Sequence, residues 1–556
     1  MEPDQLVRVR GARVHNLRDV EVAMPRDAIV AFTGVSGSGK SSLAFGTIFA
    51  ESQHRFLESV APYARRLLQQ AGTPDVDEIT GLPPAVALEQ RRSVPSARSS
   101  VGTVTMVSNS LRMLMSRAGT YPPGAARLDS DSFSPNTTAG ACPECHGQGV
   151  VYEVTEESLV PDPALTIREG AVASWPGAWQ GKNLRDILGV LGYDLDTPWR
   201  DLPREQREWI LFTEEQPVVT VHPERDPDRI QRPYQGKYSS AKRLVLHSYA
   251  DSKSETSRAR AAKFLVSNVC PVCGGRRLRR EALAVTFDGL DVAALAALPL
   301  SELAALLRRH LDDEGPAGVL AHDLVARIDV LVELGLGYLS TNRAAPTLSG
   351  GELQRLRLGT QLRSGLFGVV YVLDEPSAGL HPADVESLIS VLRRRKESGN
   401  TGVVGEHDLD VVREADWLVD VGPGAGVHGG RVLHSGPVEE LRAVEESVTR
   451  RYLFGGTAER PRTPRRPRGW LKLRGVTRNN LRDLDVDIPL GVLTAVTGVS
   501  GAGKTTLLDA LAAAEDTPRV VRVDQQPIGR TPRSNLATYT GLIDVVRKLF
   551  AATPLA

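Results

Sequence analysis

Two glycine-rich segments carry the strongest chemical signal in the chain. The first has the sequence GVSGSGKS and ends at Ser41, and the second has the sequence GVSGAGKT and ends at Thr505. Both fit G-x-x-x-x-G-K-[ST], in which backbone N–H groups surround a phosphate chain, the lysine adds positive charge and the hydroxyl binds magnesium. The spacing predicts two nucleotide sites. Their expected binding residues are Gly34, Ser36, Gly37, Gly39, Lys40, Ser41 and Ser42 in the first, and Gly498, Gly501, Gly503, Lys504, Thr505 and Thr506 in the second.

A pair of acids follows an apolar run at residues 369–373. A buried strand ending in two acids places Asp374 near the magnesium, and Glu375 where it polarises an attacking water. His407 follows another apolar run, and we expect it to sense the terminal phosphate. Taken alone, an Asp-Glu strand end is commonly solvated, and a lone histidine is commonly structural. The ordered set instead favours catalysis by Lys40, Glu375 and His407.

A third segment, Leu348-Ser349-Gly350-Gly351-Glu352, precedes the acids. Its serine hydroxyl and flexible backbone N–H groups at a helix start suit a γ-phosphate presented from another surface. Gln90 and Gln525 follow the two glycine-rich loops in matching contexts, and we expect both at the nucleotide sites.

The four cysteines form two tight pairs, Cys142 with Cys145 and Cys270 with Cys273. Four thiolates can close a tetrahedral structural zinc site, which would clamp both ends of the segment between the pairs. A redox role for each C-x-x-C is the alternative, although neither pair lies in a thioredoxin-like strand and helix context. His146 is a possible substitute ligand.

The elements that position these residues occur twice. Residues 7–45 and 471–509 align without a gap, so that Gly11 falls on Gly475 and Lys40 on Lys504. Each copy predicts alternating strands, a buried apolar strand, the glycine-rich loop and a helix. The repeat therefore indicates duplication of a whole nucleotide-binding unit.

The ordered motifs resemble the ATP-binding cassette class, with ATP and Mg2+ as cofactors. The resemblance implies an α/β fold: an ABC-type P-loop ATPase cassette with an inserted helical and zinc-binding domain and a partial second cassette. We expect residues 1–110 to form the first part of the first cassette, 111–345 the inserted signature and zinc-binding region, 346–450 the rest of that cassette, 451–470 a basic linker and 471–556 the partial second cassette.

Composition narrows the class of protein. The chain has 556 residues, of which 41% are hydrophobic, with 67 basic and 67 acidic residues. Affinity for nucleic acid or membranes therefore cannot be argued from the net charge and would have to come from local patches. No apolar run is long enough to span a bilayer and the N-terminus lacks a signal peptide pattern, so we expect a cytoplasmic protein without a membrane partner. Residues 225–243 mix basic side chains with tyrosines, which suits phosphate contact and base stacking, or else a charged surface over a small core.

Several segments together resemble the UvrA family, the damage-sensing ATPase subunit of bacterial nucleotide excision repair. They are NLRDV, ESVAPYARRLL, VGTVT, FSPNTTAGACPECHGQG, TLSGGELQRLRLGTQL, YVLDEPSAGLHPAD, GEHD and IGRTPRSNLATYTGL. The resemblance implies ATP-modulated binding of distorted double-stranded DNA by a homodimer, zinc modules at the DNA-facing surface, and loading of UvrB.

Two departures from the family pattern change these expectations. The stretch from Thr105 to Cys142 is too short for the family's UvrB-docking domain, so UvrB recruitment is doubtful. The chain resembles the shorter UvrA-like paralogues, some of which are associated with self-protection against DNA-intercalating drugs. The chain also ends at Ala556, before a second signature or acid pair. We therefore expect either a second copy to donate Ser349-Gly350-Gly351 in trans, or a truncated remnant with impaired turnover.

Overall fold

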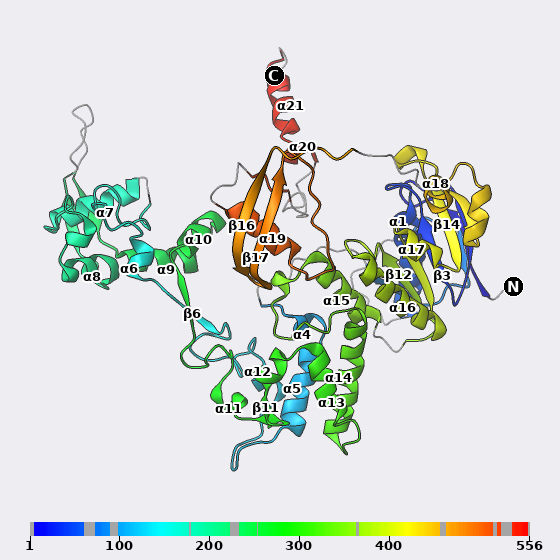
Figure 1. Cartoon of the computed structure of the whole chain (residues 1–556), viewed down its shortest axis with the longest axis horizontal. Helices are drawn as coiled ribbons and strands as arrows, with labels where there is room; N and C mark the ends of the chain where they lie inside the picture. Colours follow the sequence, from blue (N-terminus) through cyan, green and yellow to red (C-terminus); the bar gives the residue numbers. More distant parts are fainter. Residues whose placement is uncertain are drawn as a thin grey trace. The chain divides into compact units, whose positions relative to one another are not determined.

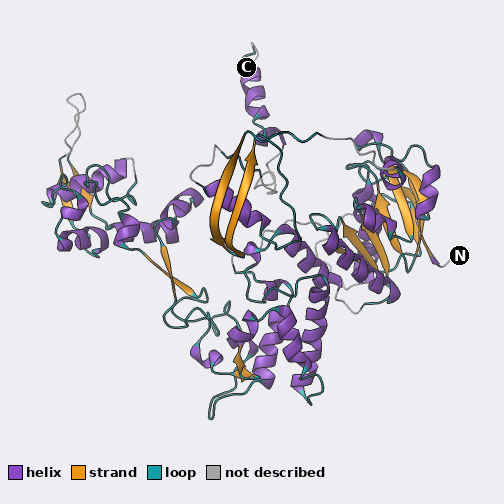
Figure 2. Ribbon diagram, viewed as in Figure 1, coloured by secondary structure: helices purple, strands orange, loops and turns teal. Residues whose placement is uncertain are grey.

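The computed structural model describes residues 5–59, 73–88, 98–176, 179–222, 233–252, 254–362, 366–455, 463–514, 520–523 and 536–553. The chain divides into two compact units, one made of residues 1–118 and 294–556 and the other of residues 119–293. Figure 1 labels the elements and Figure 2 distinguishes helices from strands. No helix of the described part has the length and apolar character needed to cross a membrane.

A six-stranded sheet organises the first unit, with β3 (Ile29–Thr33) inside it. Five strands are parallel, and β15 (Arg431–Gly436) is antiparallel at one edge. The strand order is β15, β14 (Trp417–Gly422), β3, β13 (Thr401–Gly405), β12 (Val370–Asp374) and β5 (Ala85–Leu88). Parallel strands buried on both faces form near-continuous apolar runs, and every residue of β3 is buried. This confirms the predicted cassette fold.

Alternate residues of β3 pack into two different cores. Ile29 and Ala31 face a core that includes α15 (Gly350–Leu362) and α16 (Pro382–Glu397), whereas Val30 and Phe32 face the antiparallel sheet β2-β1-β4. This follows from the two-residue period of a strand. Each fully buried Val, Leu, Ile or Phe contributes about 1.5–3 kcal/mol, so the sheet is a firm base for the loops at its ends. The antiparallel sheet contains β1 (Leu6–Ala12), β2 (Val20–Pro25) and β4 (Glu78–Thr80). The core of α15 and α16 also includes residues of α17 (Leu409–Arg413), η7 (Val438–Ala443) and α18 (Val448–Phe454). The short helix η6 (Gly426–His428) lies between β14 and β15 in the sequence.

A helical region of the first unit leads into α15. Its longest helix is α14 (Pro316–Glu333), which contacts α5 (Val107–Ala118), α13 (Leu300–Arg308) and α15. The shorter elements are α4 (Val101–Val104), α12 (Val292–Ala297) and η5 (Ala345–Thr347). The stretch between Thr105 and Cys142 contains two helical elements, α5 and η3 (Ser130–Phe133).

The second copy of the repeat begins with the hairpin of β16 (Gly469–Arg478) and β17 (Leu481–Leu490), followed by α19 (Lys504–Ala513), α20 (Leu536–Tyr539) and α21 (Leu542–Ala551). The prediction of a buried apolar strand in the second copy is wrong. Residues 493–497, which align with β3, form no strand, and Leu493 is 97% exposed where its counterpart Ile29 is 3% exposed. β3 is held by β13 and β14 on its two sides, and within the described residues no strand pairs with 493–497.

The second unit contains an inserted domain with its own core. Trp199, Tyr238 and Ile210 are buried in that core. Its elements are α6 (Glu156–Leu159), α7 (Trp179–Val190), η4 (Trp199–Asp201), α8 (Arg204–Phe212), β7 (Val218–Val221), β8 (Tyr234–Lys237), α9 (Ala241–Asp251) and α10 (Glu255–Ala262). The antiparallel pair β6 (Val150–Glu153) and β9 (Val266–Val269) leads into and out of it. The remaining elements are α11 (Arg280–Leu283), β10 (Thr286–Phe287) and β11 (Leu290–Asp291).

Candidate nucleotide sites and cysteine cluster

The first glycine-rich loop connects β3 to the helical run of α1 (Lys40–Leu43), η2 (Ala44–Phe49) and α2 (Ala50–Ser59). Gly34, Gly37 and Gly39 have φ of 131°, 78° and 118°, a backbone region that side chains rarely adopt. A Cβ on Gly34 would lie 2.0 Å from the Val421 carbonyl oxygen. Glycine is therefore required for the tight turn that directs backbone N–H groups inward.

Lys40 lies inside this loop. Its Nζ donates hydrogen bonds to the carbonyl oxygens of Gly34 at 2.8 Å and Val35 at 3.1 Å. Burial lowers the pKa of Lys40 below its ordinary value of 10.5, although Glu375, Asp374 and Asp420 oppose that shift. The ammonium group is thus a point charge held at the centre of the loop.

The second loop repeats this geometry. Gly498, Gly501 and Gly503 have φ of 142°, 80° and 100°, close to the values of their counterparts. Lys504 Nζ donates to the carbonyl oxygens of Gly498 at 2.6 Å and Val499 at 2.9 Å. Since the local sequence alone produces the same turn twice, both loops have the backbone of a phosphate-binding loop.

Two acids lie beside the first loop, at the carboxyl end of β12. Asp374 Oδ1 is 3.5 Å from Ser41 Oγ. A carboxylate and a hydroxyl, both oxygen ligands of the kind that Mg2+ prefers, therefore lie next to each other. Glu375 has φ of 43°, an uncommon conformation for a residue with a side chain, and its N–H donates to the Gly405 carbonyl oxygen at 2.8 Å. Strained backbone of this kind clusters at functional sites.

His407 completes the group of residues that the sequence placed at the first site. Its Nε2 is 3.6 Å from Glu375 Oε1. Burial and then Lys40 lower the pKa of His407 below its ordinary 6.5, with Glu375 opposing, so this environment favours the neutral ring. The structure therefore brings together the lysine, the hydroxyl, both acids and the histidine.

Residues 348–352, the signature segment, form the start of α15. Ser349 Oγ accepts from Glu352 N–H at 3.3 Å, and Glu352 Oε2 accepts from Ser349 N–H at 2.7 Å, which is a capping box. Glu352 is buried and also accepts from the Tyr338 hydroxyl at 2.6 Å. These bonds fix the serine and the following glycines at the helix start.

The signature segment lies against the second glycine-rich loop. A Cβ on Gly351 would lie 2.7 Å from Ser500 Oγ, and one on Gly501 would lie 2.4 Å from the Tyr338 hydroxyl. Ser500 N–H also donates to Asp384 at 3.4 Å. The first loop instead contacts another segment of its own cassette. The N–H of Gly426 donates a hydrogen bond to the Gly37 carbonyl oxygen at 2.9 Å.

Some supporting residues were not among the predicted site residues. Asn16 Nδ2 donates to the Gly37 carbonyl oxygen at 3.1 Å, and Asn480 Nδ2 donates to that of Gly501 at 2.9 Å. Each asparagine ties a strand hairpin to its glycine-rich loop. The gapless repeat, which aligns these two asparagines, was the signal that could have found them.

The other predicted residues differ in how far the structure describes them. Ser36 and Thr505 are exposed, Ser42 Oγ lies 3.2 Å from His15 Nδ1, and Thr506 accepts from Asn479 at 3.3 Å. Gln90 and Gln525 lie outside the described residues.

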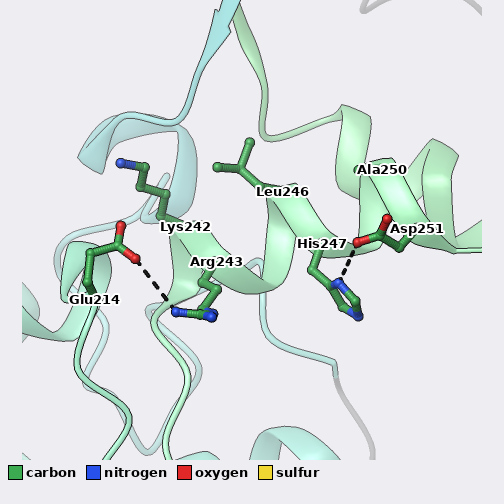
Figure 3. Close-up of a pocket in the computed structure, with 7 residues that line it drawn as sticks. All are labelled: Glu214, Lys242, Arg243, Leu246, His247, Ala250 and Asp251. Carbon is green, nitrogen blue, oxygen red and sulfur yellow. Dashed lines mark hydrogen bonds and ion pairs between the residues drawn. The ribbon is translucent and has the colours of Figure 1, made fainter.

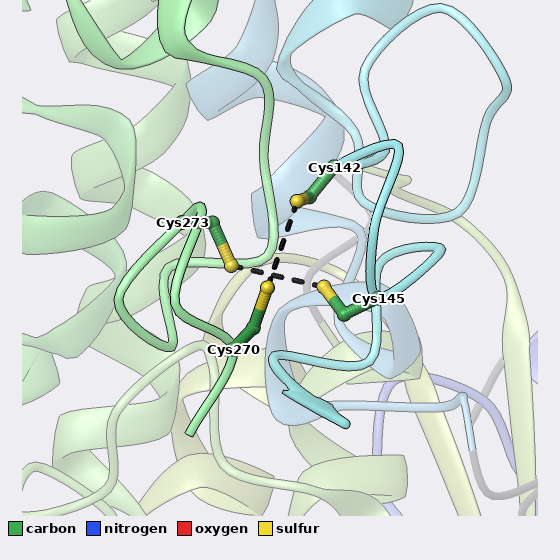
Figure 4. A group of neighbouring side chains, drawn as sticks. All are labelled: Cys142, Cys145, Cys270 and Cys273. Carbon is green, nitrogen blue, oxygen red and sulfur yellow. Dashed lines mark hydrogen bonds between the residues drawn. The ribbon is translucent and has the colours of Figure 1, made fainter. Parts of the chain in front are cut away.

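The four cysteine sulfurs of the second unit converge (Figure 4). All four residues are buried, and their sulfurs lie within 4.8 Å of one another. The distance is 3.9 Å for Cys142 to Cys270 and 3.7 Å for Cys145 to Cys273. A zinc tetrahedron with Zn–S bonds of about 2.3 Å has edges of about 3.8 Å, so the donor set fits zinc. This confirms a cluster placed to hold a metal.

Backbone groups favour thiolates in this cluster. Gly149 N–H donates to Cys145 Sγ at 3.2 Å, and Arg277 N–H donates to Cys273 Sγ at 3.3 Å. Hydrogen bonds led by the N–H of Cys273 hold the pKa of Cys270 below its ordinary value, whereas burial raises the pKa of Cys273. Such second partners orient metal-binding thiolates.

The basic and aromatic stretch of the inserted domain is partly described, since residues 223–232 lie outside the described ranges. Tyr238 is buried, donates to the Ile210 carbonyl oxygen at 2.8 Å and stacks on Trp209 at a centroid distance of 5.0 Å. Tyr238 therefore belongs to the core of the inserted domain. For this residue the structure supports a small core beneath a charged surface rather than base stacking.

A surface pocket lies along α9 (Figure 3). Arg243 lies 3.6 Å from Glu214, and His247 lies 2.7 Å from Asp251. The pocket is also lined by Lys242, Leu246 and Ala250. It therefore presents both basic and acidic side chains at the surface of the inserted domain.

The comparisons with known proteins agree with these motifs. The family described as "UvrA DNA-binding domain" matches residues 156–263, which lie between the two cysteine pairs. "UvrABC system protein A" of Paucimonas lemoignei is 54% identical over 99% of this chain and 89% of its own length, and that of Mycobacterium bovis is 37% identical over 99% and 75%.

Structural similarity points to the same family. The crystal structure of UvrA2 from Deinococcus radiodurans matches with a TM-score of 0.80 and 59% identity, covering 100% of this chain and 73% of that one. The chain therefore belongs to the UvrABC system protein A family, and it is an ABC-type ATPase that acts in DNA binding and repair.

Proposed function

We propose that the chain couples ATP hydrolysis in its first cassette to the binding of distorted duplex DNA by its inserted domain. The observation that supports this proposal most is the convergence of Lys40, Asp374, Glu375 and His407 beside one glycine-rich loop. No separate element is needed to assemble them, because the loops after β3, β12 and β13 leave the same edge of one parallel sheet.

The proposed reaction is attack of water on the γ-phosphorus of ATP with ADP as the leaving group. Glu375 takes a proton from the attacking water, and Lys40 and His407 contact the phosphate oxygens as charge develops on them. Ser41 and Asp374 would hold Mg2+, which neutralises phosphate charge. Backbone N–H groups of residues 34–41 orient the phosphate chain.

The proposed second site binds a nucleotide between Lys504 and the signature segment. It rests on the repeated lysine geometry and on the contact of the second loop with Gly351 and Tyr338. For the first site, we propose that a second copy of the chain supplies Ser349-Gly350-Gly351 in a homodimer, since the signature of the same chain lies against the second loop.

The proposed DNA contact lies on the inserted domain, with zinc at its base. Cys142, Cys145, Cys270 and Cys273 would hold Zn2+ and so clamp the start of β6 to the end of β9. We propose that the inserted domain binds duplex DNA that is distorted by a lesion or by a bound drug. We also propose that the protein acts in the cytoplasm. We further propose that UvrB loading is not part of this activity, because the stretch before Cys142 is short.

Replacing Lys40 by alanine tests the first site. We expect the Lys40→Ala chain to lose ATP hydrolysis by roughly 100- to 1,000-fold, because a positive charge at the transferring phosphate is removed. Nucleotide binding should persist at the Lys504 site, so equilibrium dialysis should still detect bound ATP.

The matched control is Lys472→Ala, which removes an exposed lysine of β16. It should hydrolyse ATP at the wild-type rate. An unchanged rate of hydrolysis in Lys40→Ala would refute the assignment of catalysis to the first loop.

A further inference from the structure

Glu406 is a buried carboxylate that directly precedes His407. It is 1% exposed. Burying a charge is costly unless hydrogen bonds replace its water. Glu406 accepts four: at Oε1 from Ser377 N–H at 2.7 Å, and at Oε2 from Ser377 Oγ at 2.8 Å, His407 N–H at 2.9 Å and Asp408 N–H at 3.2 Å.

The donors come from two different loops. Ser377 follows β12 and lies two residues after Glu375, whereas His407 and Asp408 follow β13. One carboxylate therefore fastens the loop of the proposed base to the loop of the proposed phosphate sensor. Each loop carries one residue of the proposed site, and Glu375 Oε1 lies 3.6 Å from His407 Nε2.

The strands alone do not fix this approach. Their register ends at Asp374 paired with Gly405, so Glu375 and His407 both lie beyond the ladder. Glu375 has positive φ, a conformation that persists only when its surroundings hold it. The bonds of Glu406 join both loops beyond the end of the ladder.

The donor set matches a carboxylate at Glu406. Three of the four donors are backbone N–H groups, which cannot accept a hydrogen bond in return. Burial raises the pKa of Glu406 above its ordinary value, and the hydrogen bonds from Ser377, Asp408 and His407 reduce that rise. A carboxylate satisfies all four donors, whereas a carboxamide cannot.

We propose that Glu406 is a positioning residue for ATP hydrolysis, which holds Glu375 and His407 in register by binding Ser377 and the backbone after β13. This inference rests on the proposed function of the first site. Glu406 does not touch the nucleotide in this role, so its removal should slow turnover and spare nucleotide binding.

The test is Glu406→Gln in the full chain. Glutamine has nearly the same size, but its amide nitrogen would oppose either Ser377 N–H or the N–H groups of His407 and Asp408. We expect kcat to fall about 10- to 100-fold, as for a small misplacement of reacting groups. KM for ATP, and the affinity for a non-hydrolysable ATP analogue, should stay within about twofold, because binding depends on the loop of Lys40.

Two further variants separate positioning from stability. Asp416→Asn alters a carboxylate that accepts Ile29 N–H at 2.8 Å at the opposite end of β3, so it should lower the melting temperature without lowering kcat. Ser377→Ala removes one hydroxyl donor and leaves no buried amide, so it should lower kcat less than Glu406→Gln with the same unchanged analogue affinity. Glu406→Asp, which keeps the charge, should recover part of the lost kcat.

The outcomes distinguish this inference from the function on which it rests. Wild-type kcat in both Glu406→Gln and Ser377→Ala would overturn the positioning role, and so would a loss of kcat matched by an equal loss of analogue binding. If Glu375→Gln also hydrolysed ATP at the wild-type rate, the proposed site itself would be refuted.

Discussion

Replacing Glu375 by glutamine is expected to lower the rate of ATP hydrolysis by roughly 100- to 10,000-fold, the usual contribution of a general base. Glutamine keeps the size of the side chain but cannot accept a proton from water. Lys40, Ser41 and Asp374 are untouched, so the affinity for ATP should remain near that of the wild-type chain. Steady-state phosphate release, together with equilibrium binding of ATP, measures both quantities.

The control for this variant is Glu386→Gln, which changes an exposed glutamate of α16. It should leave hydrolysis and binding unchanged. A Glu375→Gln chain with wild-type turnover would place the base elsewhere. Equal losses of turnover and binding would mean that Glu375 acts in binding rather than in the chemical step.

Replacing Cys270 by serine is expected to have the second large effect, on the metal cluster. Structural zinc sites contribute about 10–16 kcal/mol of apparent folding free energy in small domains, and a hydroxyl replaces a thiolate poorly. We expect the Cys270→Ser chain to lose bound zinc and to be cleaved faster by a protease near β6 and β9. Hydrolysis in the first cassette should persist, because its residues belong to the other unit.

Metal content after dialysis and the rate of limited proteolysis are the measurements. The control is Asn268→Ala, which removes an exposed hydrogen bond from Asn268 to Glu153 at 2.9 Å between the same two strands. It should keep the metal. Wild-type zinc content and wild-type protease resistance in Cys270→Ser would contradict a structural metal site.

Local motifs made the nucleotide loops predictable. Positive-φ glycines and a lysine six residues after the first glycine specify the turn within one short segment, and both copies show the same lysine bonds. The capping box at Ser349 and Glu352 is equally local. These features need no partner from elsewhere in the chain.

Features that depend on distant partners were harder to predict. Residues 493–497 repeat the apolar pattern of β3, but a strand needs a neighbour, and β3 has two from far along the sequence. Glu406 lies in the GEHD segment, but the motif did not predict its role, since its partner Ser377 lies in another loop. Local motifs therefore predicted the glycine-rich loops. Contacts between distant parts of the chain determined which segments form strands and what the buried carboxylate binds.

The most direct test of the account is the equilibrium affinity of the chain for duplex DNA in the presence of a non-hydrolysable ATP analogue. Intact, lesion-bearing and intercalator-loaded duplexes of the same sequence should be compared at one salt concentration, with ribosomes as the control target. We predict binding to duplex DNA that is tighter for the distorted duplexes than for the intact one. Affinity for ribosomes alone, or no affinity for any duplex, would contradict the account.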